Sequence, residues 1–342
     1  MFIAEKFKEY RRQGMENGGL HSAEKCGIVL AAGDGKRLQE FVHRIRGDAL
    51  PKQYVNLVGQ HSLLENTFAR VEQLIHPRRL FTVINGDHLK HPEVRRQLAD
   101  REPETVIVQP ANKETAPGIL LPLAHIYHRH GDAVVAVFPS DHFVGDDALF
   151  MAHIDLACRL IEHSPRQLIL LGIEPRDPET EYGYILPGRP IQASQLPAAR
   201  SVIGFEEKPA TAAARAMIAA GGLWNTMVMV FRAQTLIDSV RHVSPKLHRF
   251  FEKVRRAIGT ADEQSMVKET YGDLEPMNFS TTLLEPMARH DAARLLVLPV
   301  RNVMWSDWGS EQRIASTLQK IAPTRSAARQ PRTRPSPALS IS

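Results

Sequence analysis

Apolar and polar positions along the chain follow two alternating patterns, short apolar runs and longer stretches with helical spacing. Apolar runs typical of buried strands recur in the first half at 26–30, 79–84, 105–108, 133–138 and 167–173. Helical patterns fall between them, at 63–75, 92–100, 116–130 and 147–163. Because strands that alternate with helices form a parallel sheet covered on both faces, the pattern predicts an α/β fold with a Rossmann-like, mostly parallel central sheet.

The rhythm of the pattern changes in the second half of the chain. Strand-like runs lie at 201–205, 227–231 and 295–300, and helical patterns lie at 211–220, 233–240 and 245–258. We expect this half to elaborate the same sheet and to cover part of a substrate-binding site. The chain then divides into an N-terminal extension over 1–24, one domain over 25–321, and a disordered tail rich in Pro, Arg and Ser over 322–342.

Composition argues against several functional classes. The formal charge of +5 includes four arginines of the tail, which has no acidic residue, and without them the rest of the chain carries +1. A nearly neutral body argues against a nucleic-acid-binding surface. No apolar stretch is long enough to cross a membrane, and the N-terminus lacks the apolar core of a secretory signal. Cys26 and Cys158 are the two cysteines, and as buried free thiols they fit a reducing, cytoplasmic location.

Chemically capable residues follow the predicted strands, which is where ligands gather in open parallel sheets. The turn at 30–37, Leu-Ala-Ala-Gly-Asp-Gly-Lys-Arg, follows the first strand. Its glycines allow main-chain N–H groups to point at an anion, and two cations, Arg37 and Lys52, lie nearby in the sequence. The combination predicts a triphosphate site, although a Gly-x-Gly turn alone occurs in many folds.

Two aspartates that follow later strands are candidate metal ligands. Asp141 comes just after the strand at 133–138, a suitable place for a hard oxygen ligand of phosphate-bound Mg²⁺. The alternative for Asp141 is a helix cap, a role better placed at Asp146 or Asp147. Asp307, in Trp-Ser-Asp-Trp-Gly-Ser, supplies a second carboxylate or caps the helix that follows.

Three further segments carry groups suited to a sugar phosphate. Phe-Glu-Glu-Lys-Pro at 205–209 places Lys208 for a second phosphate and Glu207 for hydroxyl groups, or else forms a solvated charged turn. The segments 181–184 and 224–226 offer a carboxylate, an amide and glycine-exposed backbone, although their aromatic residues fit a protein core equally well.

Other chemistries lack their motifs. The cysteines do not have zinc-site spacing, and no His-x-x-x-His pair falls on a predicted helix. There is no Gly-x-Ser-x-Gly elbow for acyl transfer and no full Walker sequence. Gly33-Asp34-Gly35 lacks the third glycine of a dinucleotide fingerprint, so a nucleotide-dependent oxidoreductase is poorly supported.

Taken in chain order, these segments resemble those of the sugar nucleotidyltransferases, and among them the mannose-1-phosphate guanylyltransferases. The resemblance covers roughly residues 25–320 and rests on the segments 30–38, 51–53, 112–119, 139–142, 182–185, 205–209, 224–225 and 305–309. It implies a single α/β domain with Mg²⁺ as cofactor. The implied reaction transfers a nucleoside monophosphate from a nucleoside triphosphate to a sugar 1-phosphate and releases pyrophosphate.

The resemblance also implies roles for individual residues. The nucleotide-binding residues are Ala32, Gly33, Gly35, Arg37, Lys52, Asn85 and His88, the catalytic residues are Arg37, Lys52 and Asp141, the sugar-phosphate-binding residues are Gly183, Glu207, Lys208 and Asn225, and the metal ligands are Asp141 and Asp307. Lys52 is expected to reach the α-phosphate. The Asn-Gly-Asp-His stretch at 85–88, together with Pro51-Lys52-Gln53, favours GTP over UTP or dTTP.

The chain departs from the family pattern in three places. The stretch at 38–50 is longer than in the family, Asn225-Thr226-Met227 replaces Asn-Ser-Gly, and Ser280 stands at the Asp position of Ser-x-Asp. The last two departures lie on the sugar side, so they bear on the identity of the sugar. The alternatives are a transferase for another base or sugar, with mannose 1-phosphate as the first expectation, and a non-catalytic nucleotide or sugar-nucleotide sensor. The oligomeric state stays open, with a homo-oligomer as one option.

Overall fold

The computed structural model describes residues 24–191 and 199–321, so the predicted tail and nearly all of the predicted N-terminal extension lie outside the described residues. The strands are β1 (Lys25–Leu30), β2 (Leu80–Asn85), β3 (Val106–Gln109), β4 (Val134–Pro139), β5 (Phe143–Val144), β6 (Leu168–Ile173), β7 (Gly183–Pro190), β8 (Arg200–Glu207), β9 (Leu223–Arg232), β10 (Leu295–Val300) and β11 (Trp305–Ser306). The α-helices are α2 (Gln39–Arg46), α3 (Leu63–Val71), α4 (Pro92–Leu98), α5 (Thr115–His130), α6 (Asp147–His163), α7 (Thr211–Ala219), α8 (Ala233–Val243), α9 (Pro245–Ala257), α10 (Glu263–Asp273), α11 (Glu285–His290) and α12 (Glu311–Ile321).

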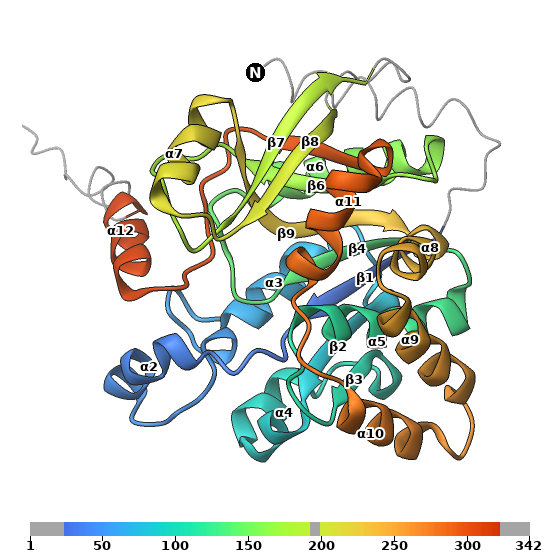
Figure 1. Ribbon diagram of the computed structural model, residues 1–342. Coiled ribbons are helices and arrows are strands. Elements are labelled where there is room, and N and C mark those ends of the chain that lie inside the picture. The colour runs from blue at the N-terminus through green and yellow to red at the C-terminus, as the bar shows by residue number, and fades with distance from the viewer. Residues whose placement is uncertain (1–23, 192–198, 322–342) are drawn as a thin grey trace, which may run out of the picture.

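Nine strands form one mixed sheet in the order β3-β2-β1-β4-β9-β6-β10-β8-β7, and Figure 1 labels all of them except β10. Strands β1 to β4 pair in parallel, and so do β6 and β10. Strand β9 pairs antiparallel with both β4 and β6, so these two groups run in the same direction. The second half of the chain therefore extends the same sheet, as predicted. Strand β7 also pairs with β9, which curls this end of the sheet.

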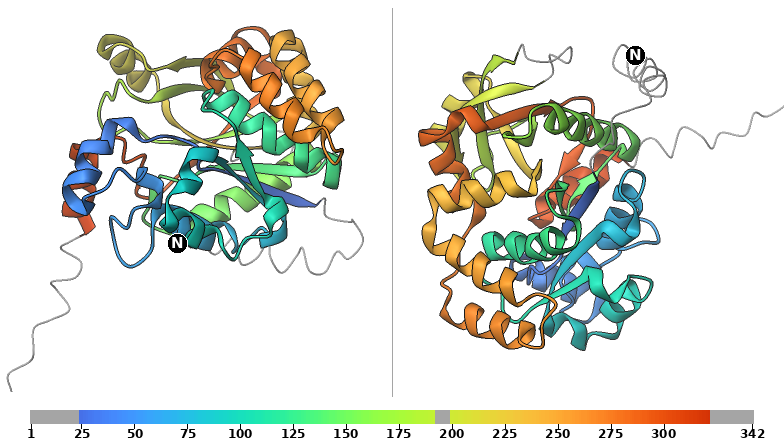
Figure 2. Two further views of the ribbon diagram at one scale, coloured as in Figure 1. Left: turned by 90° about the horizontal axis from the view of Figure 1, so that it is seen from below. Right: turned by 90° about the vertical axis from the view of Figure 1, so that its right-hand side faces the viewer.

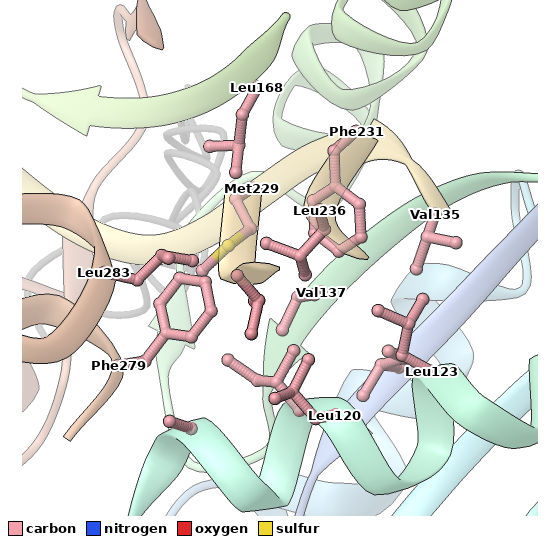
Figure 3. Packing of buried hydrophobic residues seen from close by; sticks show 14 of the residues in the cluster. Leu120, Leu123, Val135, Val137, Leu168, Met229, Phe231, Leu236, Phe279 and Leu283 are labelled. Carbon is pink, nitrogen blue, oxygen red and sulfur yellow. The ribbon is translucent and has the colours of Figure 1, made fainter. Parts of the chain in front are cut away.

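Helices cover both faces of the sheet and bury an apolar cluster on each. One cluster joins Ile28 of β1 to Leu120 of α5 and Leu236 of α8, and Figure 3 shows part of this packing. The other joins Val29, the next residue of β1, to helices α3 and α6. Successive strand residues face opposite sides of a sheet, so apolar runs without polar alternation indicate strands buried on both faces. This confirms the predicted fold class.

The predicted elements are present, with shifts at their ends and some additions. Ser62 and Glu65 form the capping box expected at the start of α3. The long stretch at 38–50 forms the additional helix α2, which lies beside α12 and is joined to it by an Arg44–Glu311 ion pair (Figure 2). Strand β7 was not predicted, because its two glycines and two prolines are typical of turns or sheet edges.

Burial explains the state of the two cysteines. Cys26 and Cys158 are both free and buried, as predicted, and burial raises the pKa of each thiol to about 12. Within 24–191 and 199–321, no helix combines the length and the apolar character needed to cross a bilayer.

Candidate functional site

The glycine turn after β1 is held from behind by the segment that contains Pro51-Lys52-Gln53. The Gln53 amide donates to the carbonyl oxygens of Ala31 at 2.9 Å and Gly33 at 2.8 Å. Gly35 has a φ of 62°, and a Cβ added there would lie 3.3 Å from the main-chain nitrogen of Lys52. Glycine is therefore required at 35 both by the backbone conformation and by the close approach of the second segment.

A cleft of about 270 Å³ opens at the carboxyl ends of the parallel strands, next to this turn. Its lining includes Leu30, Ala32, Gly33, Gln53, Asn112, Glu114, Thr115, Ser140, Asp141 and Met227. Ala32, Gly33 and Asp141 were predicted to lie together, and the cleft brings them together. A Cβ at Gly33 would meet no atom within 4 Å, so this glycine borders open space.

Lys52 is the centre of a charged cluster that includes Asp141, one of the residues lining the cleft. Its Nζ lies 3.0 Å from Oδ2 of Asp141, 2.6 Å from the carbonyl oxygen of Asp307 and 3.0 Å from that of Trp308. An ammonium group has three donors, so these contacts occupy all of them. Lys52 was expected to reach a phosphate, and it can do so only by exchanging one of these partners.

The charge at Asp141 is maintained by its neighbours. Burial would raise the pKa of the Asp141 carboxyl, but Lys52 and His142 outweigh burial and hold that pKa below its ordinary value. The ring of His142 packs edge-on against Trp305, with ring centroids 5.1 Å apart, and burial lowers the pKa of His142. An anionic carboxylate therefore faces the cleft, and it has the chemistry of a ligand for a hard cation.

The Asp307 carboxylate is engaged on the far side of the same cluster. Its Oδ1 accepts from the Tyr182 hydroxyl at 2.8 Å and from the main-chain N–H of Gly309 at 3.0 Å. Nε of Arg313 lies 2.9 Å from the same oxygen. Lys52 thus contacts both the main-chain carbonyl of Asp307 and the carboxylate of Asp141. The carboxylate of Asp307 is bound instead by three donors, from Tyr182, Gly309 and Arg313. Within the described residues, no group of three His, Cys, Asp or Glu side chains could hold a metal, so a cation here depends on the two aspartates and on substrate oxygens.

Asn85 and His88 reach the turn indirectly, through Asp34. The Asn85 amide donates to Asp34 Oδ1 at 3.4 Å, and His88 Nε2 lies 3.6 Å from the same oxygen. Nδ1 of His88 is 3.1 Å from the Tyr54 hydroxyl, and burial lowers the pKa of His88. Asn85 and His88 are buried, and through Asp34 they position the glycine turn. Sequence reasoning gave no role to Asp34, which lies within the selected turn at 30–37, or to Tyr54, which directly follows Pro51-Lys52-Gln53.

On the sugar side, Gly183, Glu207 and Asn225 come together although they lie on three different strands. Gly183 pairs with Glu207 across β7 and β8, and a Cβ at Gly183 would lie 2.6 Å from Glu207 Oε2 and 3.4 Å from Asn225 Cβ. Burial raises the pKa of Glu207. The main-chain N–H of Glu207 donates to Glu285 Oε1 at 2.9 Å, and sequence reasoning gave Glu285 no role.

An ion pair joins the two sides of the site. Nη1 of Arg37, in the glycine turn, lies 2.5 Å from Oε2 of Glu181, two residues before β7. Both side chains are about half exposed. Arg37 is therefore positioned beside the sugar-side segment, and a phosphate would compete with Glu181 for it.

Backbone strain is concentrated at the site. Non-glycine residues with positive φ in the described ranges are Glu114, Lys208, Met227, Asn302 and Trp308. Four of them, all except Asn302, fall in segments selected from the sequence or in the cleft lining. Such conformations cost free energy and persist where the surrounding structure imposes them, so their clustering supports a functional site.

Comparisons with known proteins identify the family to which the chain belongs. The chain matches the nucleotidyl transferase family over residues 26–323. Xanthan biosynthesis protein XanB of Xanthomonas campestris is 29% identical over 285 residues, which are 83% of this chain and 57% of that protein. A mannose-1-phosphate guanylyltransferase of Klebsiella pneumoniae is 30% identical over 242 residues, which are 70% of this chain and 48% of that protein. The chain spans about half the length of the curated relatives it matches.

A solved structure is also similar. The crystal structure described as mannose-1-phosphate geranyltransferase from Thermus thermophilus is 29% identical, with a TM-score of 0.70. The match covers 84% of this chain and 76% of that one. Sequence and fold therefore point to the same family.

Proposed function

Since this chain belongs to the nucleotidyl transferase family, we propose that it transfers GMP from GTP to mannose 1-phosphate in the cytoplasm and releases pyrophosphate. The observation that carries the proposal is the charged cluster around Lys52. In this cluster Lys52 contacts the main-chain carbonyl of Asp307 and the carboxylate of Asp141, and Asp141 lines the cleft together with Gly33 of the glycine turn. Guanine is supported by the Asn-Gly-Asp-His and Pro-Lys-Gln segments, and both guanine and mannose are supported by the name of the Klebsiella relative.

The reaction we propose is a direct in-line displacement. An oxygen of the sugar 1-phosphate attacks the α-phosphorus of GTP, and the bond between this phosphorus and the oxygen that bridges to the β-phosphate breaks. Such reactions depend mainly on positioning and on charge neutralisation, so no covalent enzyme intermediate is needed. Arg37 and Lys52 offset charge on the departing pyrophosphate, and Lys208 binds the sugar phosphate.

Asp141 and Asp307 are the proposed holders of Mg²⁺. Bound there, the ion would neutralise phosphate charge that the side chains alone leave unbalanced. Asp141 fits this role as it stands, since its carboxylate faces the cleft. Asp307 fits once its carboxylate exchanges Arg313 for the cation.

A panel that combines each nucleoside triphosphate with several sugar 1-phosphates tests the proposal. We expect pyrophosphate release and a nucleotide-sugar product, identified by its mass, to be fastest with GTP and mannose 1-phosphate. A different fastest pair would revise the base or the sugar. No pyrophosphate from any pair in the presence of Mg²⁺ would reject the enzyme activity.

A binding protein without turnover is the second candidate, and the engagement of Asp307 by Arg313 favours it. If Arg313 never releases this carboxylate, the chain binds nucleotide but does not react it. Calorimetric binding of GTP without pyrophosphate release, together with turnover in Arg313→Ala, would support this candidate.

A further inference from the structure

Arg313 of α12 occupies the oxygens through which Asp307 would hold a cation. Its Nε lies 2.9 Å from Asp307 Oδ1, and its Nη2 lies 3.3 Å from Oδ2. Both side chains are 16% exposed, so water and salt screen this pair only weakly. An arginine that contacts both oxygens of a carboxylate forms one of the stronger ion pairs in proteins. Arg313 therefore supplies the positive charge that the proposed cation would otherwise supply.

The remaining donors to the Asp307 carboxylate bind one of its two oxygens. The Tyr182 hydroxyl donates to Oδ1 at 2.8 Å, and the main-chain N–H of Gly309 donates to the same atom at 3.0 Å. Among the hydrogen bonds and ion pairs of 24–191 and 199–321, Oδ2 has Arg313 as its one partner. Release of Arg313 would therefore free Oδ2 for a cation, while Tyr182 and Gly309 keep the carboxylate in place.

Arg313 has further partners besides Asp307. Its Nη1 pairs with Glu179 Oε2, and its Cζ lies 4.9 Å from the centroid of the Tyr182 ring. A cation over an aromatic face is stabilised by the quadrupole of the ring. Loss of a sole partner would leave a largely buried charge unpaired, which is costly. With Glu179 and Tyr182 in contact, Arg313 can release Asp307 and still be paired.

A second cavity, of about 310 Å³, lies beside this pair. Its lining includes Glu179, Tyr182 and Arg313, and within the described part of the chain it shares no lining residue with the cleft. Trp224 of β9 also lines it, whereas the next residue, Asn225, belongs to the sugar side, and successive strand residues point to opposite faces of a sheet. The guanidinium therefore has room to move toward Glu179 without entering the cleft.

We propose that Arg313 is an internal counterion of Asp307, that Asp307 exchanges it for the cation when the nucleotide binds, and that Glu179 holds Arg313 after the exchange. The inference rests on the proposed nucleotidyl transfer and deepens it by adding two positioning residues to the cation site. Neither residue touches the reacting atoms. Arg313 controls whether Asp307 Oδ2 is available, and Glu179 controls how readily Arg313 leaves it.

The test measures by calorimetry how tightly the full chain binds the α,β-methylene analogue of GTP, which cannot be cleaved at that bond, in Mg²⁺ and in EDTA. The ratio of the dissociation constant in EDTA to that in Mg²⁺ reports what the cation adds to binding, without turnover. In Arg313→Gln the competing charge is removed, and we expect this ratio to rise by about 5- to 50-fold. In Glu179→Gln, Arg313 retains Asp307 as its carboxylate partner. Since Glu179 is 34% exposed, we expect the ratio to fall by about two- to fivefold.

A double variant separates this exchange from the effect of charge at a distance, which would also shift the two single variants in opposite directions. If Glu179 acts through Arg313, adding Glu179→Gln to Arg313→Gln should leave the ratio unchanged. An equal fall in both backgrounds overturns the inference. Asp177→Asn is the matched control, because Asp177 lines the same cavity but is not paired with Arg313 in the described ranges. Its ratio should match that of the wild type, and a fall as large as that of Glu179→Gln also overturns the inference.

Thermal unfolding of each variant shows whether it is folded, and Arg313→Met replaces Arg313→Gln if the latter does not fold. An unchanged ratio in the folded variant, or a wild-type ratio near one, overturns the inference. Pyrophosphate release from GTP and mannose 1-phosphate decides the proposed function separately. The expected ratios without pyrophosphate from any pair would support the exchange and overturn the proposed turnover.

Discussion

The nucleotide side and the sugar side of the cleft are built in different ways. On the nucleotide side the parallel strands β1 and β4 end next to each other, and buried side chains hold the turns that follow. Ser140 Oγ donates to the carbonyl oxygen of Leu30 at 2.7 Å, and Gln53 and Tyr54 hold the carbonyl of Ala31. On the sugar side the residues come from the antiparallel strands β7, β8 and β9, with Lys208 and Met227 at positive φ.

This difference indicates which side of the site tolerates substitution and which does not. The carboxyl ends of parallel strands lie at one edge of the sheet. The turns that follow these strands therefore lie close together and can form a binding site. In antiparallel strands the pairing register determines which side chains face the site. A substitution at one of these positions therefore changes the group that faces the acceptor. We therefore expect substitutions on the nucleotide side to abolish turnover, and substitutions on the sugar side to redirect it.

The largest expected effect is that of Asp141→Asn on turnover. This change removes the carboxylate that faces the cleft and pairs with Lys52, and we expect kcat to fall by about 10³-fold or more. Pyrophosphate release with GTP, Mg²⁺ and mannose 1-phosphate measures it. Asp147→Asn is the matched control, because Asp147 pairs with Arg70 outside the cleft lining. Wild-type turnover in Asp141→Asn would remove Asp141 from the mechanism.

The next effect is that of Gly33→Ala on nucleotide binding. A Cβ at Gly33 meets no protein atom within 4 Å, so stability should be unchanged, whereas the methyl group obstructs a phosphate approaching the turn. We expect KM for GTP to rise by about 10- to 100-fold. Gly272→Ala is the control: this position in α10 is equally open, and Ala there should stabilise the helix by about 0.5–1 kcal/mol without changing kinetics. Unchanged GTP binding in Gly33→Ala would place the phosphates elsewhere.

A smaller effect is expected from the ion pair that connects the two sides. Glu181→Gln releases Arg37 from its carboxylate partner, and we expect KM for GTP to fall by about two- to fivefold, since an exposed ion pair contributes little free energy. Steady-state kinetics at low ionic strength measure it. Glu311→Gln breaks the similarly exposed Arg44–Glu311 pair away from the cleft and should leave KM unchanged. Equal responses of the two variants would show that Arg37 does not meet the triphosphate.

The smallest expected effect is the change of folding stability with pH. The sign of this change differs between His88 on the nucleotide side and Glu207 on the sugar side. Burial lowers the pKa of His88, so the unfolded state binds more protons and the wild type loses stability as pH falls below about 6.5. Burial raises the pKa of Glu207, so stability from this group is lost as pH rises above about 4.5, its ordinary value. Urea unfolding at several pH values should show a weaker acid loss in His88→Gln. In Glu207→Gln the stability relative to wild type should increase as pH rises. Parallel profiles for wild type and either variant would contradict the corresponding assignment.

Much of the nucleotide side could be predicted from the sequence. The apolar run at 26–30 and the glycines after it depend on local propensity, and a strand-end rule then places Gly33 and Asp141 in one cleft. The sugar side was only partly predictable. The expected strand at 227–231 starts after Asn225, but β9 begins at Leu223, so Asn225 lies within the strand, and its amide contacts Met227.

The charged cluster shows the same limit. The sequence indicated that Lys52, Asp141 and Asp307 carry chemistry, but not that Lys52 is enclosed by Asp141 and two carbonyl oxygens, or that Arg313 holds the Asp307 carboxylate. These contacts join residues far apart in the chain. A local sequence pattern does not show which of several possible donors will form a hydrogen bond or ion pair with a given carboxylate.

By itself the sequence determined the α/β class, the alternation of strands and helices, and the segments that carry charge and glycine, because these follow from periodicity and from backbone preference over a few residues. The tertiary structure alone decided which of those groups are free and which are bound to one another. Hydrogen bonds and ion pairs at the site depend on distances of a few ångström between distant segments, and only the closed and curled sheet sets those distances.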